Sequence, residues 1–205
     1  MVDDLGSGAM LDTSHFGWSH EPTVQESLAA GADVVCFSGD KLFGGPQAGI
    51  IVGKRVYLDR IKKHPLARAI RADKTLLLGL EATILHYLKD AAIKEIPVWK
   101  MISAPLDEMR RRAENWKTVL QFGETCPGLS TIGGGSMPEE TVPTWVFSLS
   151  LKNPDQFAAR LRVQSPAVIT RIQDEKVMFD PRTVLPSQDV TLINLLQKTY
   201  KEHIK

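Results

Sequence analysis

The sequence predicts an α/β protein in which part of a large α/β domain is followed by a small α+β domain. Three observations lead to this prediction. A short helical pattern, VQESLAAG at 24–31, precedes the apolar run VVCF at 34–37, as a crossover helix precedes a strand in an α/β sheet. A glycine-rich turn separates that run from a second one, IIV at 50–52. From residue 144 onward, short strand and helix patterns alternate.

Composition bounds the class of protein. A chain of 205 residues holds one large or two small cores, and 43% hydrophobic with 24% charged residues is typical of a globular domain. The net charge of +1 gives no overall attraction to nucleic acid or membrane, so any RNA binding requires a local basic surface. Cys36 and Cys126 lie far apart in unlike contexts, which predicts neither a metal site nor a disulfide framework. With no membrane-length apolar run and no signal-peptide pattern, we expect a cytoplasmic protein.

The first segment, VDDLGSG at 2–8, reads as the end of a strand followed by a glycine loop. Asp3 and Asp4 stand where the strand ends, and adjacent strand residues point to opposite faces, so only one of them can serve a given site. In the loop 9–22 we expect ordinary packing or solvent contacts for His15 and His20. The helix that follows opens at Pro22 or Thr23 and ends with Gly31 as its C-cap.

Lys41 stands at the junction of the two predicted central strands. It follows SGD at 38–40 and precedes the turn GGPQAG at 44–49. An ammonium group placed among apolar neighbours loses hydration, so its pKa falls and the amine becomes a nucleophile, most commonly for a Schiff base with an aldehyde cofactor such as pyridoxal phosphate (PLP). Glycines next to it allow close approach of a flat cofactor or a partner chain. The competing interpretation is a solvated lysine in a hairpin turn.

Two arginines follow in a basic stretch. Apolar spacing predicts a helix over 54–63 that stops at His64–Pro65. In the segment 66–74, Arg68 and Arg71 are three residues apart, so a helix would place both guanidinium groups on one face as a fork for an oxyanion. A solvated basic face is the competing interpretation. The amphipathic pattern over 75–89 predicts a helix that packs in the core or at a subunit contact.

The middle of the chain predicts a connection. A long helix over 105–122 carries Arg110, Arg111 and Arg112, which cannot share one face and therefore favour solubility, with contacts to phosphates as the alternative. Residues 123–143 are rich in Gly, Pro, Ser and Thr. Their triple glycine, 133–135, lacks the Lys-Ser/Thr of a phosphate-binding P-loop, so we interpret it as a flexible turn.

The C-terminal part predicts a small α+β domain. We expect strands over 144–149, 168–172 and 176–179, a helix over 154–162, and a closing helix over 187–201 with Ser187 as N-cap. The predicted organisation is therefore the C-terminal part of a large domain over 1–104, a linking helix and loop over 105–143, and a small domain over 144–205.

Four segments carry a resemblance to a known family. SGDKLFGGPQAGI at 38–50 closely resembles the cofactor-lysine segment of bacterial selenocysteine synthase, the L-seryl-tRNA(Sec) selenium transferase, which is a fold-type I PLP enzyme. VDDLGSG at 2–8, HPLARAIRADK at 64–74 and RIQDEKVMFDPRTV at 171–184 match in the same order. The likeness spans nearly the whole chain. It implies part of a fold-type I large domain followed by a small α+β domain, and it implies that the chain is a C-terminal fragment, because the family has further elements before VDDLGSG.

The resemblance implies roles for individual residues. Lys41 matches the lysine that holds PLP, and Asp4 matches the acid that keeps the pyridine nitrogen protonated, with Asp3 as the alternative. Arg68 and Arg71 match arginines associated with the selenium donor, selenophosphate. Ser38 is a candidate ligand of the cofactor phosphate, because a hydroxyl can bond an anion. Gly44 and Gly45 are candidates to accept a neighbouring subunit, since the family forms a ring-shaped homodecamer built from dimers.

The implied reaction is PLP-dependent conversion of seryl-tRNA(Sec) to selenocysteinyl-tRNA(Sec), in which Lys41 also moves the Cα proton. Two other functions stay open. One is a related PLP-dependent β-eliminating lyase acting on a small amino acid or sugar acid, and the other is an inactive oligomerisation module. Arg182 lies where many related enzymes bind a free carboxylate. Because the serine carboxylate is esterified in this reaction, we leave Arg182 unassigned, with a structural ion pair as the competing role.

Overall fold

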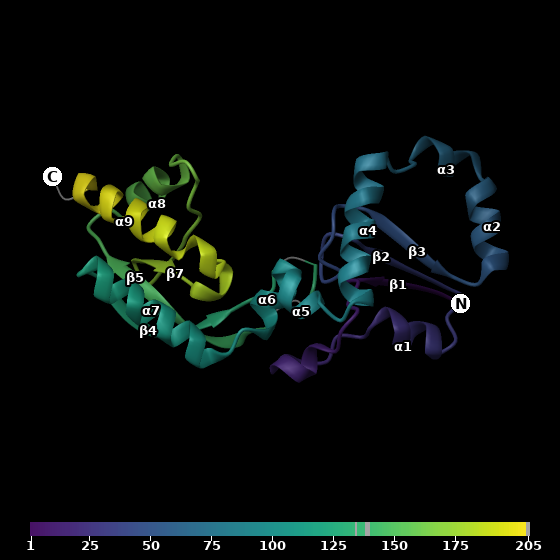
Figure 1. The fold of residues 1–205 in the computed structure, drawn as a ribbon, viewed down its shortest axis with the longest axis horizontal. Helices are drawn as coiled ribbons and strands as arrows, with labels where there is room; N and C mark the ends of the chain where they lie inside the picture. The colour runs from purple at the N-terminus through teal and green to yellow at the C-terminus, as the bar shows by residue number, and fades with distance from the viewer. Residues whose placement is uncertain (134, 138–139, 204–205) are drawn as a thin grey trace. The chain divides into compact units, whose positions relative to one another are not determined.

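The computed structural model describes residues 1–133, 135–137 and 140–203, which form two units (Figure 1). The first unit contains Met1–Ser103 and Thr131–Thr141, and the second contains Ala104–Ser130 and Val142–Lys205. The segment 105–143, predicted as one linking helix and loop, is therefore divided between the two units. Within the described residues, no helix combines the length and apolar character needed to cross a membrane.

The first unit is built on a three-stranded mixed sheet in the order β1-β2-β3. Strand β1 (Val2–Gly6) runs parallel to β2 (Val34–Ser38), and the connection between them contains α1 (Val24–Ala29). Strand β3 (Gly49–Gly53) pairs with β2 in antiparallel orientation. This confirms the expected pair of strands on either side of Lys41 and the expected crossover helix.

Side-chain alternation gives the two faces of this sheet different partners. On one face, Val35 and Phe37 pack with Val24 of α1 and with Leu80 and Tyr87 of α4 (Lys74–Leu88). Val34 and Cys36 of β2 point to the opposite face because successive strand side chains alternate. That face borders an apolar groove of about 650 Å³, walled on its other side by α2 (Arg55–Lys63) and α3 (Pro65–Ala69).

Local signals explain where the helices of this unit begin and end. Thr23 caps α1 by accepting a hydrogen bond from the backbone N–H of Glu26, and the Glu26 carboxylate accepts one from the backbone N–H of Thr23 at 2.7 Å. The C-cap is Ala30, and Gly31 follows it with a φ of 99°, which a residue without Cβ adopts at little cost. Two short helices complete the unit, α5 (Ala92–Glu95) and α6 (Pro97–Ser103).

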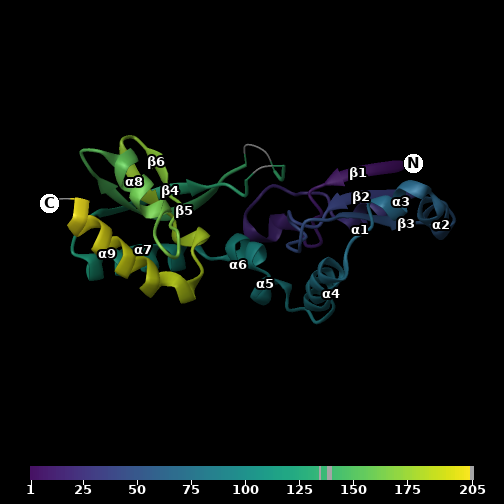
Figure 2. The same cartoon turned by 90° about the horizontal axis from the view of Figure 1, so that it is seen from above.

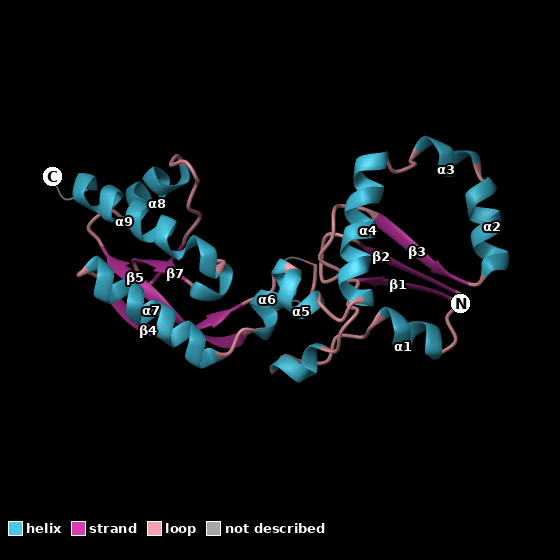
Figure 3. Cartoon of the chain, viewed as in Figure 1, coloured by secondary structure: helices cyan, strands magenta, loops and turns pink. Residues whose placement is uncertain are grey.

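The second unit is a four-stranded antiparallel sheet covered by helices (Figures 2 and 3). Its strand order is β4-β5-β7-β6, formed by Glu124–Ser130, Val142–Ser150, Lys176–Phe179 and Arg171–Gln173. Three helices pack against it, α7 (Leu106–Leu120), α8 (Pro154–Arg162) and α9 (Asp189–His203), and α7 and α9 are neighbours. Their shared core contains Trp116, Phe147, Phe157, Leu161, Val177 and Leu196, all fully buried.

The ranges of α8 and β7 agree with the sequence-based prediction, and three other features differ from it. Strand β4 was not expected, because proline and glycine at positions 127 and 128 weaken the strand signal. The strand forms nevertheless, because β4 lies at the edge of its sheet, where proline is tolerated. Strand β6 is shorter than predicted. Ser187 is not an N-cap, since it lies inside a short 3-10 turn, Pro186–Gln188, and α9 begins at Asp189.

Two arginines of this unit have structural roles. Arg112 is nearly buried and donates to the Asp189 carboxylate at 2.5 and 3.1 Å and to the carbonyl oxygens of Pro181 and Val184. The expectation that the arginine run serves solubility or phosphates is therefore wrong for Arg112. Arg182 is 5% exposed and donates to the carbonyl oxygens of Ala104 and Pro143, and burial lowers its pKa from the ordinary value.

Candidate active site

Lys41 is held in a turn that backbone hydrogen bonds fasten to both neighbouring strands. The N–H of Leu42 donates to the carbonyl of Ser7, just beyond β1, at 2.9 Å. On the other side, the N–H of Gly45 donates to the carbonyl of Gly39 at 2.7 Å, and that of Gly44 donates to the carbonyl of Lys41 itself at 2.9 Å. The backbone of Lys41 is thus positioned by the sheet rather than by a free loop.

A half-buried tyrosine supports the same turn from α4. Tyr87 donates its hydroxyl to the carbonyl of Phe43 at 2.8 Å and accepts a hydrogen bond from the indole of Trp99 at 2.6 Å. The rings of Phe43 and Tyr87 stack with 5.6 Å between centroids. Burial raises the pKa of Tyr87 to about 12, so the hydroxyl remains a donor. The helical pattern over 75–89 predicted packing, and nothing in it singled out this anchor.

The Lys41 side chain is half-buried, and its amine lies between two glycines. A Cβ built on Gly6, the last residue of β1, would lie 3.9 Å from Nζ of Lys41. A Cβ built on Gly135 would lie only 2.9 Å from the same nitrogen, and Gly135 also has a φ of 80°. A side chain at 135 would therefore displace the flexible end of Lys41, and the positive φ also favours glycine there.

Lys41 lines a cavity of about 310 Å³ within the first unit. Its lining combines apolar side chains with a few polar groups: Asp40, Lys41, Gly44, Gly45, Pro97, Val98, Ile132, Gly133 and Ser136. Among the described residues, the hydroxyl of Ser136 has no hydrogen-bond partner, although Ser136 is only 4% exposed. A mainly apolar cleft with a few convergent polar groups is typical of a small-molecule site.

Sequence reasoning missed the glycine segment as part of this site. The triple glycine was interpreted as a flexible turn, yet Gly133 and Gly135 belong to the first unit. Gly135 lies next to the Lys41 amine, and Gly133 lines the same cavity as Lys41; Gly134 lies outside the described residues. The expectation for Gly44 also changes. A Cβ at Gly44 would clash with the side chain of Ile96 in the same unit. The absence of a side chain at Gly44 therefore makes room for Ile96 of its own chain.

The two candidate acids lie on the strand that leads to Gly6. Asp4 pairs with Cys36 of β2 and is exposed, whereas Asp3 pairs with Val35 and is half-buried. Burial and the negative charges of Asp4 and Asp3 raise the pKa of the Cys36 thiol. A register shift separates Asp4 from Gly6. Which acid serves the pyridine nitrogen stays a prediction.

Among the described residues, no hydrogen bond or ion pair links the other candidates to the Lys41 side chain. Ser38 ends β2 opposite Gly49 and is half-buried. Arg68 lies on α3, but this helix ends at Ala69, so Arg71 lies beyond it and the expected common helical face is not formed. Both arginines are exposed, and among the described residues no hydrogen bond or ion pair joins either of them to Lys41. Their binding roles stay predictions.

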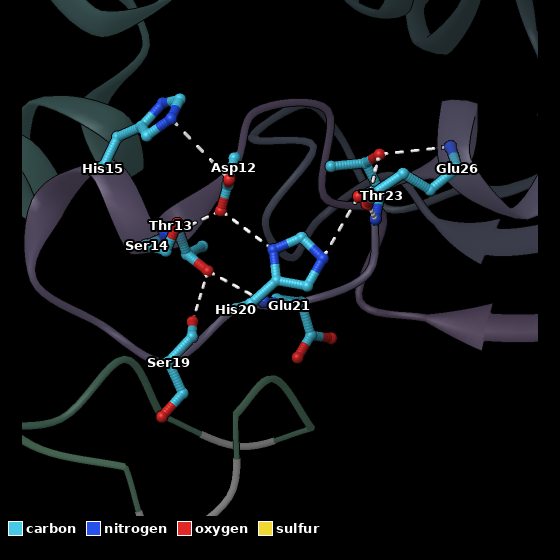
Figure 4. Close-up of polar contacts among 9 residues, drawn as sticks. All are labelled: Asp12, Thr13, Ser14, His15, Ser19, His20, Glu21, Thr23 and Glu26. Carbon is cyan, nitrogen blue, oxygen red and sulfur yellow. Dashed lines mark hydrogen bonds and ion pairs between the residues drawn. The ribbon is translucent and has the colours of Figure 1, made fainter.

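A charged network orders the loop between β1 and α1 (Figure 4). His20 contacts two carboxylates, with Nδ1 at 2.9 Å from Oδ1 of Asp12 and Nε2 at 3.2 Å from Oε1 of Glu26. Asp12 also accepts from the backbone N–H of Ser14 at 2.9 Å. The hydrogen bond to Asp12 raises the pKa of His20. His20 thus makes specific charged contacts, where the sequence predicted only ordinary loop contacts.

This loop connects to the glycine segment near Lys41. Ser19 donates its hydroxyl to the carboxylate of Glu140 at 2.7 Å, and Thr13 donates to the carbonyl of Ser19 at 2.6 Å. Trp18 is buried, and its indole donates to the carbonyl of Ile102 on α6 at 3.5 Å. The loop therefore holds α6 and the segment 131–141 within one unit.

Comparison with known proteins identifies relatives over nearly the whole chain. A family model described as L-seryl-tRNA selenium transferase matches residues 1–185. The L-seryl-tRNA(Sec) selenium transferase of Alkaliphilus metalliredigens is 46% identical and covers 98% of this chain and 45% of the relative. That of Clostridium botulinum strain 657 is 40% identical and covers 100% of this chain and 46% of the relative. The chain thus spans about half the length of the curated relatives it matches.

Among solved structures, a D-glucosaminate-6-phosphate ammonia-lyase matches with a TM-score of 0.56 and 19% identity, over 86% of this chain and 46% of the lyase. At this identity the likeness shows the fold alone. It agrees with the fold class predicted from the sequence, part of a fold-type I large domain followed by a small α+β domain.

Proposed function

The chain belongs to the L-seryl-tRNA selenium transferase family, and from this we propose that it takes part in the PLP-dependent conversion of seryl-tRNA(Sec) to selenocysteinyl-tRNA(Sec). The observation that carries the proposal is that Lys41 is half-buried and lines a 310 Å³ cavity. The names of the chain's relatives support the reaction, and the position of Lys41 in a cavity supports the chemistry of a reactive amine.

The residues around Lys41 fit PLP. Lys41 lines a cavity rather than a packed core, and Gly135 leaves beside its amine the space that a Cβ would take. When bound, PLP supplies an electron sink for the carbon adjacent to the substrate amine. In this proposal Lys41 holds the cofactor through its amine and, once released by substrate, moves the proton at the substrate Cα.

Other residues of the chain have supporting roles in the proposal. Asp4, or alternatively Asp3, keeps the pyridine nitrogen protonated, and Ser38 donates its hydroxyl to the cofactor phosphate. Arg68 and Arg71 attract the anionic selenium donor, selenophosphate, because guanidinium groups bind phosphate-like oxyanions well. Since these two arginines are exposed, closure of the donor site requires further protein surface. A homodecamer built from dimers and a cytoplasmic location complete the proposal.

The two alternatives have less support. The likeness to an ammonia-lyase shows fold alone and so does not favour a lyase activity. An inactive oligomerisation module would not need a lysine that lines a cavity. Labelling of Lys41 by PLP therefore separates an enzyme from such a module.

The first experiment asks whether Lys41 binds the cofactor. The purified protein is mixed with PLP, the mixture is reduced with borohydride, and the labelled peptide is identified by mass spectrometry. We expect the label on Lys41 and its loss in Lys41→Ala, with Lys54→Ala as control, because Lys54 is exposed and pairs with Asp33. Equal labelling of several surface lysines would contradict the proposal.

The second experiment tests the reaction itself. The PLP-loaded protein is supplied with seryl-tRNA(Sec) and selenophosphate, and the esterified amino acid is identified after mild hydrolysis. We expect selenocysteine, no product with Lys41→Ala, and a loss specific to selenophosphate use when Arg68 and Arg71 are both replaced by alanine. Release of pyruvate from free serine instead would favour the lyase.

A further inference from the structure

The segment 54–74 is strongly basic in a chain whose net charge is only +1. It holds eight of the 25 Lys and Arg residues but only two of the 24 Asp and Glu residues. The segment forms α2 and α3 at one margin of the first unit and ends where α4 begins (Figures 1 and 2). All eight cations are exposed: Lys54, Arg55, Arg60, Lys62, Lys63, Arg68, Arg71 and Lys74. The local basic surface that RNA binding requires is therefore present.

Most of these cations are not neutralised by the protein itself. Lys54 pairs with Asp33 at 2.6 Å, and Arg55 pairs with Asp59 at 3.5 Å. The second acid of the segment, Asp73, caps α4 through a backbone N–H. Among the residues that the structure describes, no ion pair joins the other six cations to a carboxylate. A concentration of exposed charge of one sign attracts a partner of the opposite sign.

The two sides of α2 differ in character. Tyr57 and Ile61 line the apolar groove between α2 and the sheet. Arg55 and Lys62 are seven residues apart and so share another face of the helix, with Lys63 next to Lys62. At 1.5 Å per residue, Arg55 and Lys62 lie about 10 Å apart along the helix axis. A single small anion cannot contact both of them, whereas successive phosphates of a nucleic acid can.

We propose that Arg55, Lys62 and Lys63, which form the outer face of α2, contact the phosphate backbone of the tRNA that carries the substrate serine. This inference rests on the proposed function, which takes seryl-tRNA(Sec) as the substrate. Arg68 and Arg71 follow in the same basic segment and keep the role proposed for them with the selenium donor. Phosphate contacts position an RNA without reading its sequence, and they make the affinity depend on salt.

A membrane surface is the competing partner, because a basic amphipathic helix also binds anionic lipid. Such a helix inserts its apolar side into the lipid. The apolar side of α2, however, lines a groove opposite Val34 and Cys36 of β2 and Ile51 of β3 in its own unit. The basic outer face alone is then left for a partner, which favours a hydrophilic polyanion over a lipid bilayer.

The salt dependence of tRNA binding tests the outer face of α2. Binding of a fluorescently labelled tRNA(Sec) transcript to the intact protein is measured by anisotropy at several KCl concentrations. We expect Lys62→Gln combined with Lys63→Gln to weaken binding by about 10- to 50-fold near about 0.1 M salt. The slope of log Kd against log salt should fall by about 1–2, because two phosphate contacts are lost. Labelling of Lys41 by PLP should not change, which shows that the first unit is folded.

Lys198→Gln combined with Lys201→Gln is the matched control. It removes the same charge from two exposed lysines of α9 in the second unit. This variant should bind tRNA(Sec) with the affinity and the salt slope of the unmodified protein. Equal weakening by the two double variants would show that net charge alone governs binding, and this result would overturn the inference.

Other outcomes separate this inference from the proposed function. Unchanged affinity and slope in the variant of Lys62 and Lys63 would overturn the inference alone, since formation of selenocysteine by the unmodified protein would stand. If that variant keeps tRNA binding but no longer sediments with phosphatidylserine vesicles, the outer face belongs to a membrane contact and the inference is wrong. Failure of the unmodified protein to bind tRNA(Sec) or to label Lys41 with PLP would contradict the proposed function as well.

Discussion

The two units differ in how completely they bury their apolar surface. In the second unit, helices α7, α8 and α9 cover the sheet and enclose a core that includes Trp116 and Phe157, both fully buried. In the first unit, one sheet face is covered, while the other borders an apolar groove of about 650 Å³. Large apolar side chains of α3 and α4 also stay exposed, including Leu66, Leu78 and Leu88.

This difference separates stability from site geometry. Side chains of the second unit contribute mainly through burial, which accounts for most of the favourable free energy of folding. The site residues of the first unit lie at strand ends and in glycine turns, where the backbone path decides what reaches the Lys41 amine. Extensive exposed apolar surface marks a region of interaction with further protein. Substitutions in the second unit should therefore lower the free energy of unfolding, whereas substitutions near Lys41 in the first unit should reduce labelling by PLP.

The largest expected effect is on the core of the second unit. Phe157→Ala should lower the free energy of unfolding by about 3–5 kcal/mol, because it removes a fully buried ring and leaves a cavity. Denaturant titration measures this change, followed by tryptophan fluorescence in a Trp18→Phe and Trp99→Phe background, so that the remaining tryptophans, Trp116 and Trp145, report on the second unit. Val163→Ala, at the C-cap of the same helix and 81% exposed, should change little. A large loss of PLP labelling in folded Phe157→Ala would break the proposed separation.

A smaller effect is expected for the buried arginine. Arg112→Ala should destabilise the second unit by about 2–4 kcal/mol, because it leaves the Asp189 carboxylate and two backbone carbonyls without their donor. Arg111→Ala is the control, since Arg111 is the exposed neighbour in the same run. Equal stability of the two variants in denaturant titration would show that Arg112 contributes no more than a surface charge.

The first unit is tested at Gly135. Gly135→Ala should reduce labelling of Lys41 by PLP by about tenfold or more, because the new Cβ would crowd the amine and the positive φ disfavours alanine. Gly133→Ala separates these causes, since Gly133 also has a positive φ but, among the described residues, no atom lies within 4 Å of its Cβ position. If both variants lose labelling equally, backbone strain rather than crowding controls access. Stability of the second unit should not change.

The smallest expected effect depends on pH. Because the pKa of His20 is raised in the folded protein, its contribution to stability is complete below its ordinary pKa of 6.5 and disappears as the pH rises through the raised value. Asp12, whose pKa is lowered, contributes above its ordinary value of 3.8 and less in acid. Amide exchange in the loop 12–20 should therefore become faster at alkaline pH. His20→Gln should remove this dependence beyond the intrinsic change of exchange rate with pH.

Some features followed from the sequence because they depend on local pattern. A short stretch of sequence is enough to recognise the apolar spacing and the bounding residues of some elements. These are the strand pair around Lys41, the helix at 154–162 and the strand at 176–179. The family was also recognisable, because SGDKLFGGPQAGI and three further segments match in order. Lys41 is the site residue that such local information identified and whose cavity the structure describes.

Other features were decided only by tertiary structure, because they depend on contacts between distant segments. The run Arg110–Arg112 reads as uniformly polar, yet packing buries Arg112 against Asp189. Glycine and serine at 135 and 136 read as a turn, yet the chain returns them to the amine of Lys41. A sequence window records which residues are neighbours along the chain, whereas burial and hydrogen bonding depend on which groups meet in space, and folding alone determines that.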